Sequence, residues 1–125
     1  MIADAQITFL PVADLKRSRA FYEGILGLEL VVDQGACHIF RAADAGFVGT
    51  CINERAAAAA GVIVTLVTVD VDGWCARIVA GGHPIEREPE HNARFGIYHA
   101  FLRDPDGHVI EIQRFDDPDW DTAPK

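Results

Sequence analysis

The segment VADLKRSRAFY at residues 12–22, followed by ILGL at 25–28, determines how the first half of the chain is organised. Asp14 can cap a helix that runs to about Leu26, where Gly27 supplies a stop. Hydrophobic and β-branched residues bounded by turn-forming residues predict one strand before this helix and three after it. The first half is therefore predicted to be β-α-β-β-β, with strands over residues 6–12, 28–33, 36–42 and 47–53.

The second half has the same order of elements. Val62–Val69 is rich in β-branched residues and is expected to be a strand, and Asp70 or Asp72 can cap a helix that ends at the glycines 81–82. Three further strands are expected over 84–87, 94–103 and 108–115, with a tight turn at 104–107. The predicted fold is α+β in a single domain, with module one at 1–54, a linker at 55–61, module two at 62–115 and an acidic tail at 116–125.

Composition narrows the classes of function. The chain has 125 residues, half of them hydrophobic, which suits one globular domain. A net charge of −8 argues against nucleic acid as a partner, because phosphate backbones are bound by clustered lysines and arginines. No membrane span or signal peptide is recognised, so a cytoplasmic protein is expected. We interpret the negative charge of the acidic tail as a contribution to solubility and not as a means of attracting a cationic ligand or partner.

The cysteines Cys37, Cys51 and Cys75 form an odd, widely spaced set without a CxxC pair. This spacing indicates neither a disulfide framework nor a cysteine zinc site. Each cysteine is expected to be a buried, reduced, small hydrophobic residue.

Two stretches resemble the vicinal oxygen chelate superfamily, which includes glyoxalase I, extradiol dioxygenases, fosfomycin-resistance enzymes and the bleomycin- and mitomycin-binding proteins. They are residues 12–28 quoted above and the closing AFLRDPDGHVIEI at 100–112. The resemblance covers essentially the whole chain. It implies two β-α-β-β-β modules whose sheets curve into an open cup, usually within a homodimer.

The resemblance also implies where a divalent metal would be held, at the first and last strand of each module. Three of these positions lack the histidine, glutamine or glutamate of metal-using relatives, and only Glu111 matches. No cofactor is therefore expected, and Glu111 is the sole candidate if a metal binds. The first strand of module one has Ile7 at this position, and the first strand of module two has Ile63 or Val64. The last strand of module one has Cys51, Ile52 or Asn53 there, and Glu54 would fit only if that strand were longer.

Strand alternation predicts which side chains accompany Glu111. With a turn at 104–107, Ala100 lies opposite Glu111, and Tyr98 shares its face. His99 is then expected on the other face. A bulge or a different turn would reverse this assignment, because a slip of one residue moves every side chain to the other face.

The favoured function is binding of a small organic molecule, for example to sequester an antibiotic, by a homodimeric protein without a complete metal site. Glu111 then serves as a polar anchor, and Trp120 can fold over the mouth of the cup and stack on a planar ligand. One alternative is a metal-dependent lyase, isomerase or dioxygenase with an atypical ligand set around Glu111. The other is a metal-free enzyme with Glu111 as general base. The predicted ligand-binding residues are Ile7, Phe9, His38, Phe40, Ile63, Tyr98, Glu111, Phe115 and Trp120.

Overall fold

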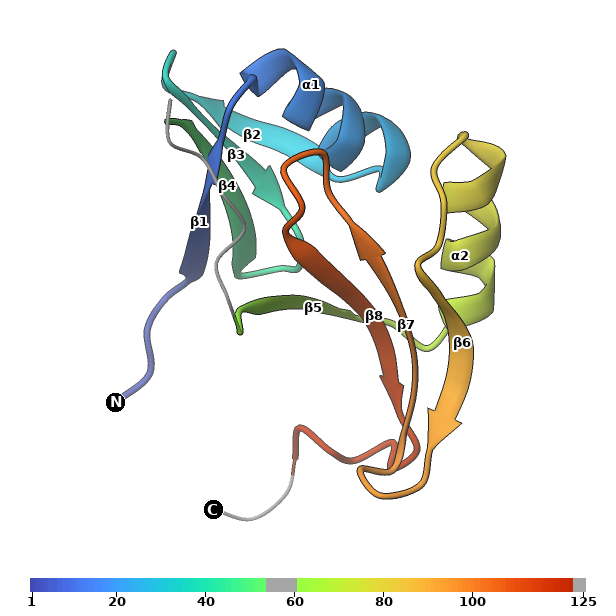
Figure 1. Ribbon diagram of the computed structural model, residues 1–125. Coiled ribbons are helices and arrows are strands. Elements are labelled where there is room, and N and C mark those ends of the chain that lie inside the picture. The colour runs from blue at the N-terminus through green and yellow to red at the C-terminus, as the bar shows by residue number, and fades with distance from the viewer. Residues whose placement is uncertain (54–60, 123–125) are drawn as a thin grey trace.

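A computed structural model describes residues 1–53 and 61–122, and these form two β-α-β-β-β modules of an α+β fold (Figure 1). Most of the predicted linker lies outside the described residues. The first module contains β1 (Gln6–Val12), α1 (Leu15–Arg19), the π-helix η1 (Ala20–Ile25), β2 (Glu29–Asp33), β3 (Cys37–Arg41) and β4 (Gly46–Ile52). The second contains β5 (Ile63–Val67), α2 (Val71–Ala80), β6 (Arg87–Asn92), β7 (Ile97–Arg103) and β8 (Val109–Phe115).

The capping residues predicted from the sequence are confirmed. The Asp14 carboxylate accepts a hydrogen bond from the Arg17 amide at 3.1 Å, and Asp70 accepts one from the Gly73 amide at 3.0 Å. The first helix differs from the expected continuous α-helix, because it changes to π geometry at Ala20.

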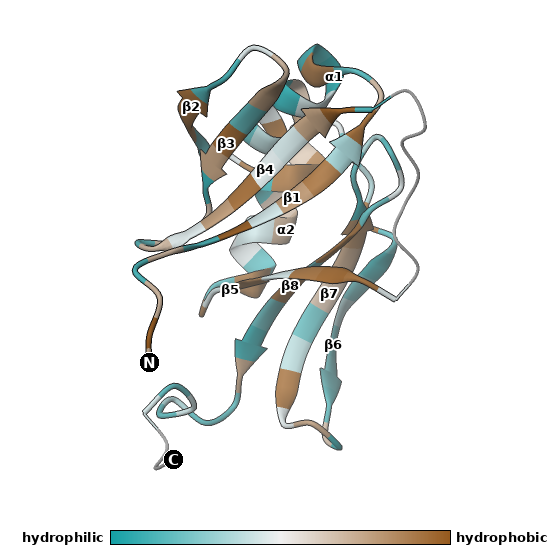
Figure 2. Cartoon of the chain, turned by 90° about the vertical axis from the view of Figure 1, so that its left-hand side faces the viewer, coloured by the Kyte–Doolittle hydropathy of each residue, from teal (hydrophilic) through white to brown (hydrophobic). Residues whose placement is uncertain are grey.

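Each module contributes one four-stranded sheet, with strand orders β1-β4-β3-β2 and β5-β8-β7-β6. In each sheet the first and last strands of the module run parallel, and the other pairs are antiparallel. Figures 1 and 2 show α1 and α2 on the same side of the two sheets. We call the opposite side of both sheets the open face.

One hydrophobic core joins the two modules beneath the helices. It includes Tyr22 and Phe40 from the first module and Ile78, Leu102 and Ile110 from the second, all at most 2% exposed. Hydrogen bonds also cross between the modules. The Tyr22 hydroxyl donates to Asp104 at 2.7 Å, and His108 Nε2 lies 2.8 Å from the Pro11 carbonyl oxygen. The modules are therefore fixed to each other through their helix sides.

The sixth strand was predicted in the wrong place. The strand expected at 84–87 runs instead over Arg87–Asn92, with an irregular register between Arg87 and Glu90. This segment is largely hydrophilic (Figure 2) and contains Pro89, features that are uncommon in a strand. β6 is an edge strand of its sheet, where proline and polar residues are tolerated.

The prediction that all three cysteines are reduced is also wrong. Cys37 and Cys51 form a disulfide between directly paired positions of β3 and β4, with their Cα atoms 4.1 Å apart. Sequence spacing cannot reveal this pair, because the 14-residue separation brings the cysteines together only through strand pairing. Cys75 is free and buried, as predicted. Disulfides are typical of oxidising compartments, so the cytoplasmic expectation gains no support from this bond.

No helix in the described part of the chain is long and apolar enough to cross a membrane.

Candidate functional site on the open face

A buried carboxylate with three hydrogen-bonding neighbours lies on the open face of the second sheet. Glu111 is 8% exposed. Its Oε1 accepts a hydrogen bond from the Thr65 hydroxyl at 2.7 Å, and its Oε2 lies 2.6 Å from His99 Nδ1. The Gln113 amide nitrogen lies 2.9 and 3.2 Å from the two carboxylate oxygens in the orientation that lets it donate. These contacts fix the Glu111 carboxylate in place.

The predicted register of the last hairpin is wrong by one residue. Glu111 pairs with Phe101, and His99 pairs with Gln113, so His99 shares the face of Glu111. The physical reason lies in the turn, where Asp104 accepts hydrogen bonds from the backbone amides of Asp106 and His108 at 2.9 and 2.8 Å. These bonds draw His108 into the turn, which makes the connection one residue longer than expected.

Three predicted ligand-binding residues lie on the helix side of the sheets and not on the open face. Phe40 is fully buried and stacks on Tyr22, with the ring centroids 5.6 Å apart. His38 is 8% exposed and makes an edge contact with Phe40. The Tyr98 hydroxyl donates to Asp72 of α2 at 2.5 Å. Tyr98 is misplaced for the same reason as His99, because the register slip moves it to the other face.

The remaining predicted residues do lie on the open face. Ile7 and Phe9 of β1 are 42% and 49% exposed, and Ile63 of β5 is 51% exposed. Phe115 at the end of β8 stacks on Trp120, with ring centroids 4.3 Å apart and the ring planes inclined by 18°. The open face therefore combines exposed apolar side chains with the polar cluster at Glu111.

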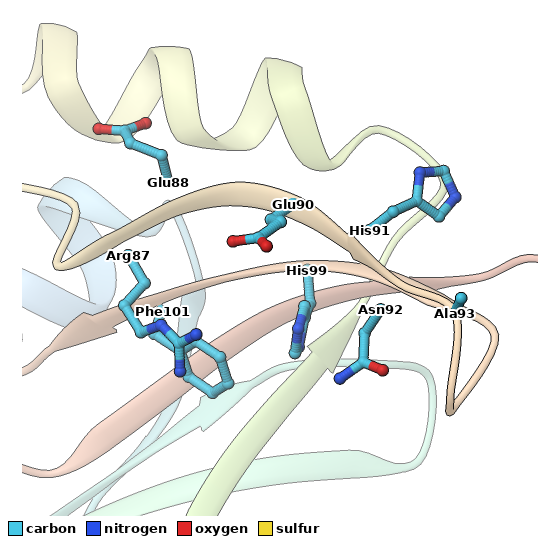
Figure 3. A pocket seen from close by; sticks show the side chains of 8 residues that line it. All are labelled: Arg87, Glu88, Glu90, His91, Asn92, Ala93, His99 and Phe101. Carbon is cyan, nitrogen blue, oxygen red and sulfur yellow. The ribbon is translucent and has the colours of Figure 1, made fainter.

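Two cavities flank this polar cluster. The larger, of about 550 Å³, extends from β1 and the β3–β4 turn to β5, where Thr65 and Trp120 line it from the open face and Val48 and Leu66 line it from the helix side. The smaller, of about 250 Å³, lies over β6 and β7 (Figure 3). His99 lines the smaller cavity together with Arg87, Asn92 and Phe101. Thr65 lines the larger cavity and His99 lines the smaller one, and both form hydrogen bonds with the Glu111 carboxylate. Glu111 therefore lies between the two cavities.

The residues present do not fit the four-ligand metal site implied by the resemblance. Ile7 and Ile63 have no lone pairs to donate. The strand register pairs Phe9 with Gly49 in the first module, as it pairs Thr65 with Glu111 in the second. By this correspondence Gly49, and not Cys51, Ile52 or Asn53, is the counterpart of Glu111. A side chain at Gly49 would collide with the Phe9 ring. Glu54 lies outside the described residues, among which no group of three potential metal ligands occurs.

The sequence interpretation missed two of the three hydrogen-bonding neighbours of Glu111, and only Gln113 was expected beside it. His99 was assigned to the opposite face, and neither Thr65 nor Arg87 was considered part of a site. Asp104 offered the one usable signal, because an aspartate at the start of a turn can accept amide hydrogen bonds from residues two and four positions later. Such bonds indicate a longer turn and therefore the correct register.

Comparison with known proteins assigns this arrangement to a family. The model of the glyoxalase/bleomycin resistance protein/dioxygenase superfamily matches residues 5–112. The chain belongs to this superfamily. No curated protein matches the sequence.

Solved structures of other superfamily proteins have the same fold. A glyoxalase/bleomycin resistance protein from Albidiferax ferrireducens T118 is 26% identical, with a TM-score of 0.68 over 86% of this chain and 95% of that one. A lactoylglutathione lyase from Agrobacterium tumefaciens is 25% identical, with a TM-score of 0.69 over 86% and 90%. A putative glyoxalase family protein from Bacillus anthracis is 16% identical, with a TM-score of 0.77 over 92% and 97%. Glyoxalase-superfamily proteins of differing names thus share this scaffold.

Proposed function

We propose that this glyoxalase-superfamily protein binds a small organic molecule on its open face, without a complete metal site, and thereby sequesters a drug-like compound or metabolite. The observation that carries the proposal is the pairing of a fixed buried carboxylate, Glu111, with an apolar cavity beside it. Ligand pockets generally combine apolar walls with a few well-placed polar groups.

The larger cavity suits the bulk of such a molecule. Its volume of about 550 Å³ lies within the range of roughly 300–1,000 Å³ found for small-molecule pockets. Apolar side chains of β4 and β5 line it, including Phe47, Ile63 and Val67, and Trp120 adds an indole ring from the tail. Thr65 contributes a hydroxyl that is already oriented by Glu111. These features favour a ligand with a planar aromatic part and at least one polar substituent.

A calorimetric screen tests this function. The panel contains a bleomycin-type glycopeptide, a mitomycin-type quinone and planar aromatic antibiotics, and at least one compound is expected to bind with one-to-one stoichiometry. Trp120→Ala should weaken that binding about tenfold, because an aromatic contact contributes roughly 0.5–1.5 kcal/mol beyond its buried area. Trp74→Phe on α2 is the matched control and should leave affinity unchanged. Absence of binding across the panel would contradict the proposal.

We also propose that two copies of the chain associate through part of the open face. Ile7 and Phe9 of β1, which do not line the larger cavity, expose 42% and 49% of their surface there, which is a large share for neighbouring apolar side chains. Sedimentation velocity at micromolar concentrations is expected to give a dimer. Phe9→Glu should convert it to a monomer, whereas Val79→Glu on the exposed side of α2 should not. A monomeric native protein would refute the association.

A further inference from the structure

We propose that the Cys37–Cys51 disulfide is a reversible redox site on the open face, which low-molecular-weight thiols reduce and low-molecular-weight disulfides restore while the chain stays folded. The pair is therefore an exchangeable couple and not a structural cross-link. Neither the two cavities nor the Glu111 cluster contributes to this couple, so it is independent of the proposed ligand binding.

The disulfide lies at one end of the first sheet, where a small thiol can reach it. Cys37 is the first residue of β3 and directly follows residues 33–36, which are all exposed. Cys51 is followed by Ile52, which is 51% exposed, and both cysteines are themselves only partly buried. Because His38 points to the helix side, the alternation of side chains along β3 directs Cys37 to the open face. The bond is therefore outside the hydrophobic core.

The first module is held together by contacts that do not involve the disulfide. β4 pairs with β1 along all seven of its residues and with β3 over five consecutive pairs. The core residues of this sheet, such as Phe40 and Val48, lie on the other side. The cross-link spans a sequence separation of only 14 residues. We therefore expect reduction to lower the Tm by about 10 °C without unfolding the chain at room temperature.

The strand register keeps the two cysteines together after the bond is broken. They occupy directly paired positions of β3 and β4, which run side by side (Figure 2), with Cα atoms 4.1 Å apart. The next pairs, His38 with Thr50 and Ile39 with Gly49, maintain this register without either sulfur. A thiolate on one strand therefore faces its partner at a high effective concentration. This arrangement makes reoxidation an intramolecular step that requires no rearrangement of the fold.

The third cysteine does not compete for the disulfide. Cys75 on α2 is 5% exposed. Burial, together with the negative charges of Glu88 and Asp72, raises the pKa of its thiol, so the thiol stays protonated and is a poor nucleophile. Exchange is therefore confined to Cys37 and Cys51.

The small thiol is the only reductant that the exchange needs. Its thiolate attacks one sulfur of the bond, forms a mixed disulfide with that cysteine and releases the other cysteine as a thiolate, which takes up a proton. A second small thiol attacks the mixed disulfide and releases the first cysteine. In total, two small thiols are oxidised to one disulfide, and two electrons and two protons pass to Cys37 and Cys51. The reverse steps use a low-molecular-weight disulfide as the oxidant.

Counting thiols in glutathione buffers tests the couple. The oxidised protein is equilibrated without air in graded ratios of glutathione to glutathione disulfide, quenched with acid and then labelled with a maleimide in urea. One label per chain, on Cys75, is expected in oxidising buffers and three in reducing buffers, with the same curve from either direction. The far-UV circular dichroism should stay constant. Cys75→Ala is the matched control and should lose one label at every ratio, with the midpoint ratio unchanged to within about twofold.

Two variants separate an exchangeable couple from a structural cross-link. The double variant Cys37→Ser, Cys51→Ser should fold and melt about 10 °C below the oxidised protein, at the Tm of the reduced native protein. Cys51→Ser alone should present a Cys37 thiol that reacts with maleimide in the folded state. A bond that resists millimolar glutathione until urea unfolds the chain would overturn the proposal. Reduction that abolishes the circular dichroism signal, or a reduced protein that glutathione disulfide does not reoxidise, would overturn it as well.

Discussion

Replacing Asp104 with alanine is expected to lower the free energy of unfolding by about 3–5 kcal/mol, because a buried, multiply bonded carboxylate is lost. Asp104 is 4% exposed. Its Oδ2 accepts from the Tyr22 hydroxyl at 2.7 Å, and its Oδ1 accepts from two backbone amides of the turn. The substitution leaves the fully buried Tyr22 hydroxyl without its acceptor and weakens the contact between the modules.

Urea unfolding measures this effect, and Asp44→Ala in the exposed β3–β4 turn is the control. That control should change the unfolding free energy by less than about 0.5 kcal/mol. An Asp104→Ala variant as stable as the native protein would show that the contact between the modules does not depend on this carboxylate.

The dependence of stability on alkaline pH tests the same hydrogen bond between Tyr22 and Asp104 independently. Burial, together with the negative charge of Asp104, raises the pKa of Tyr22 above its usual range. Native Tyr22 therefore keeps its proton at a pH where the unfolded chain loses it, so its contribution to stability is complete below about pH 10 and decreases as the pH rises further. In a Tyr22→Phe variant, which keeps Asp104, the free energy of unfolding should no longer show the part of its decrease above about pH 10 that comes from Tyr22.

The second large effect is expected at Glu111. Glu111→Leu should lower the free energy of unfolding by about 2–4 kcal/mol and abolish binding of the aromatic ligand, because it leaves Gln113 and His99 without their shared acceptor in a largely buried setting. Glu111→Gln keeps the shape and should reduce stability less. Thr65→Val tests one hydrogen bond of the same network and should cost about 1 kcal/mol.

Thermal unfolding and calorimetry on the same samples separate the two parts of this prediction. Glu86→Leu is the matched control, because Glu86 forms a surface ion pair with Arg103 and is 47% exposed in its side chain. A Glu111→Leu variant with native stability and native ligand affinity would show that the Glu111 network organises neither the sheet nor the site.

The fold could be predicted from the sequence because its signals are local. Asp14 and Asp70 fix the starts of both helices, and β-branched runs identify β5 and β8. β6 could not be placed, because an edge strand need not be hydrophobic and its polar residues resemble a loop. Where two modules have the same order of elements, the local signals in one half support those in the other.

The site could be predicted only in part because it depends on register. Glu111 was identified from the resemblance of the closing hairpin to the superfamily, but the side chains beside it change with each one-residue slip in register. The carboxylate of Asp104 lengthened the turn and moved His99 next to Glu111. His38 and Phe40 were misplaced because a strand with two apolar faces does not reveal by its pattern which face meets the helices. The disulfide was missed because it depends on the pairing of two strands.

Binding without a metal is tested by calorimetry, in which a compound that binds in the screen is titrated into protein that has been treated with a chelator and dialysed. The metal-free protein is expected to bind it with the same affinity as untreated protein, to within about twofold, because Glu111 is held by side chains and its counterpart Gly49 offers no ligand. Binding that disappears with the metal and returns only when Ni²⁺, Zn²⁺, Fe²⁺, Mn²⁺ or Co²⁺ is restored would contradict it.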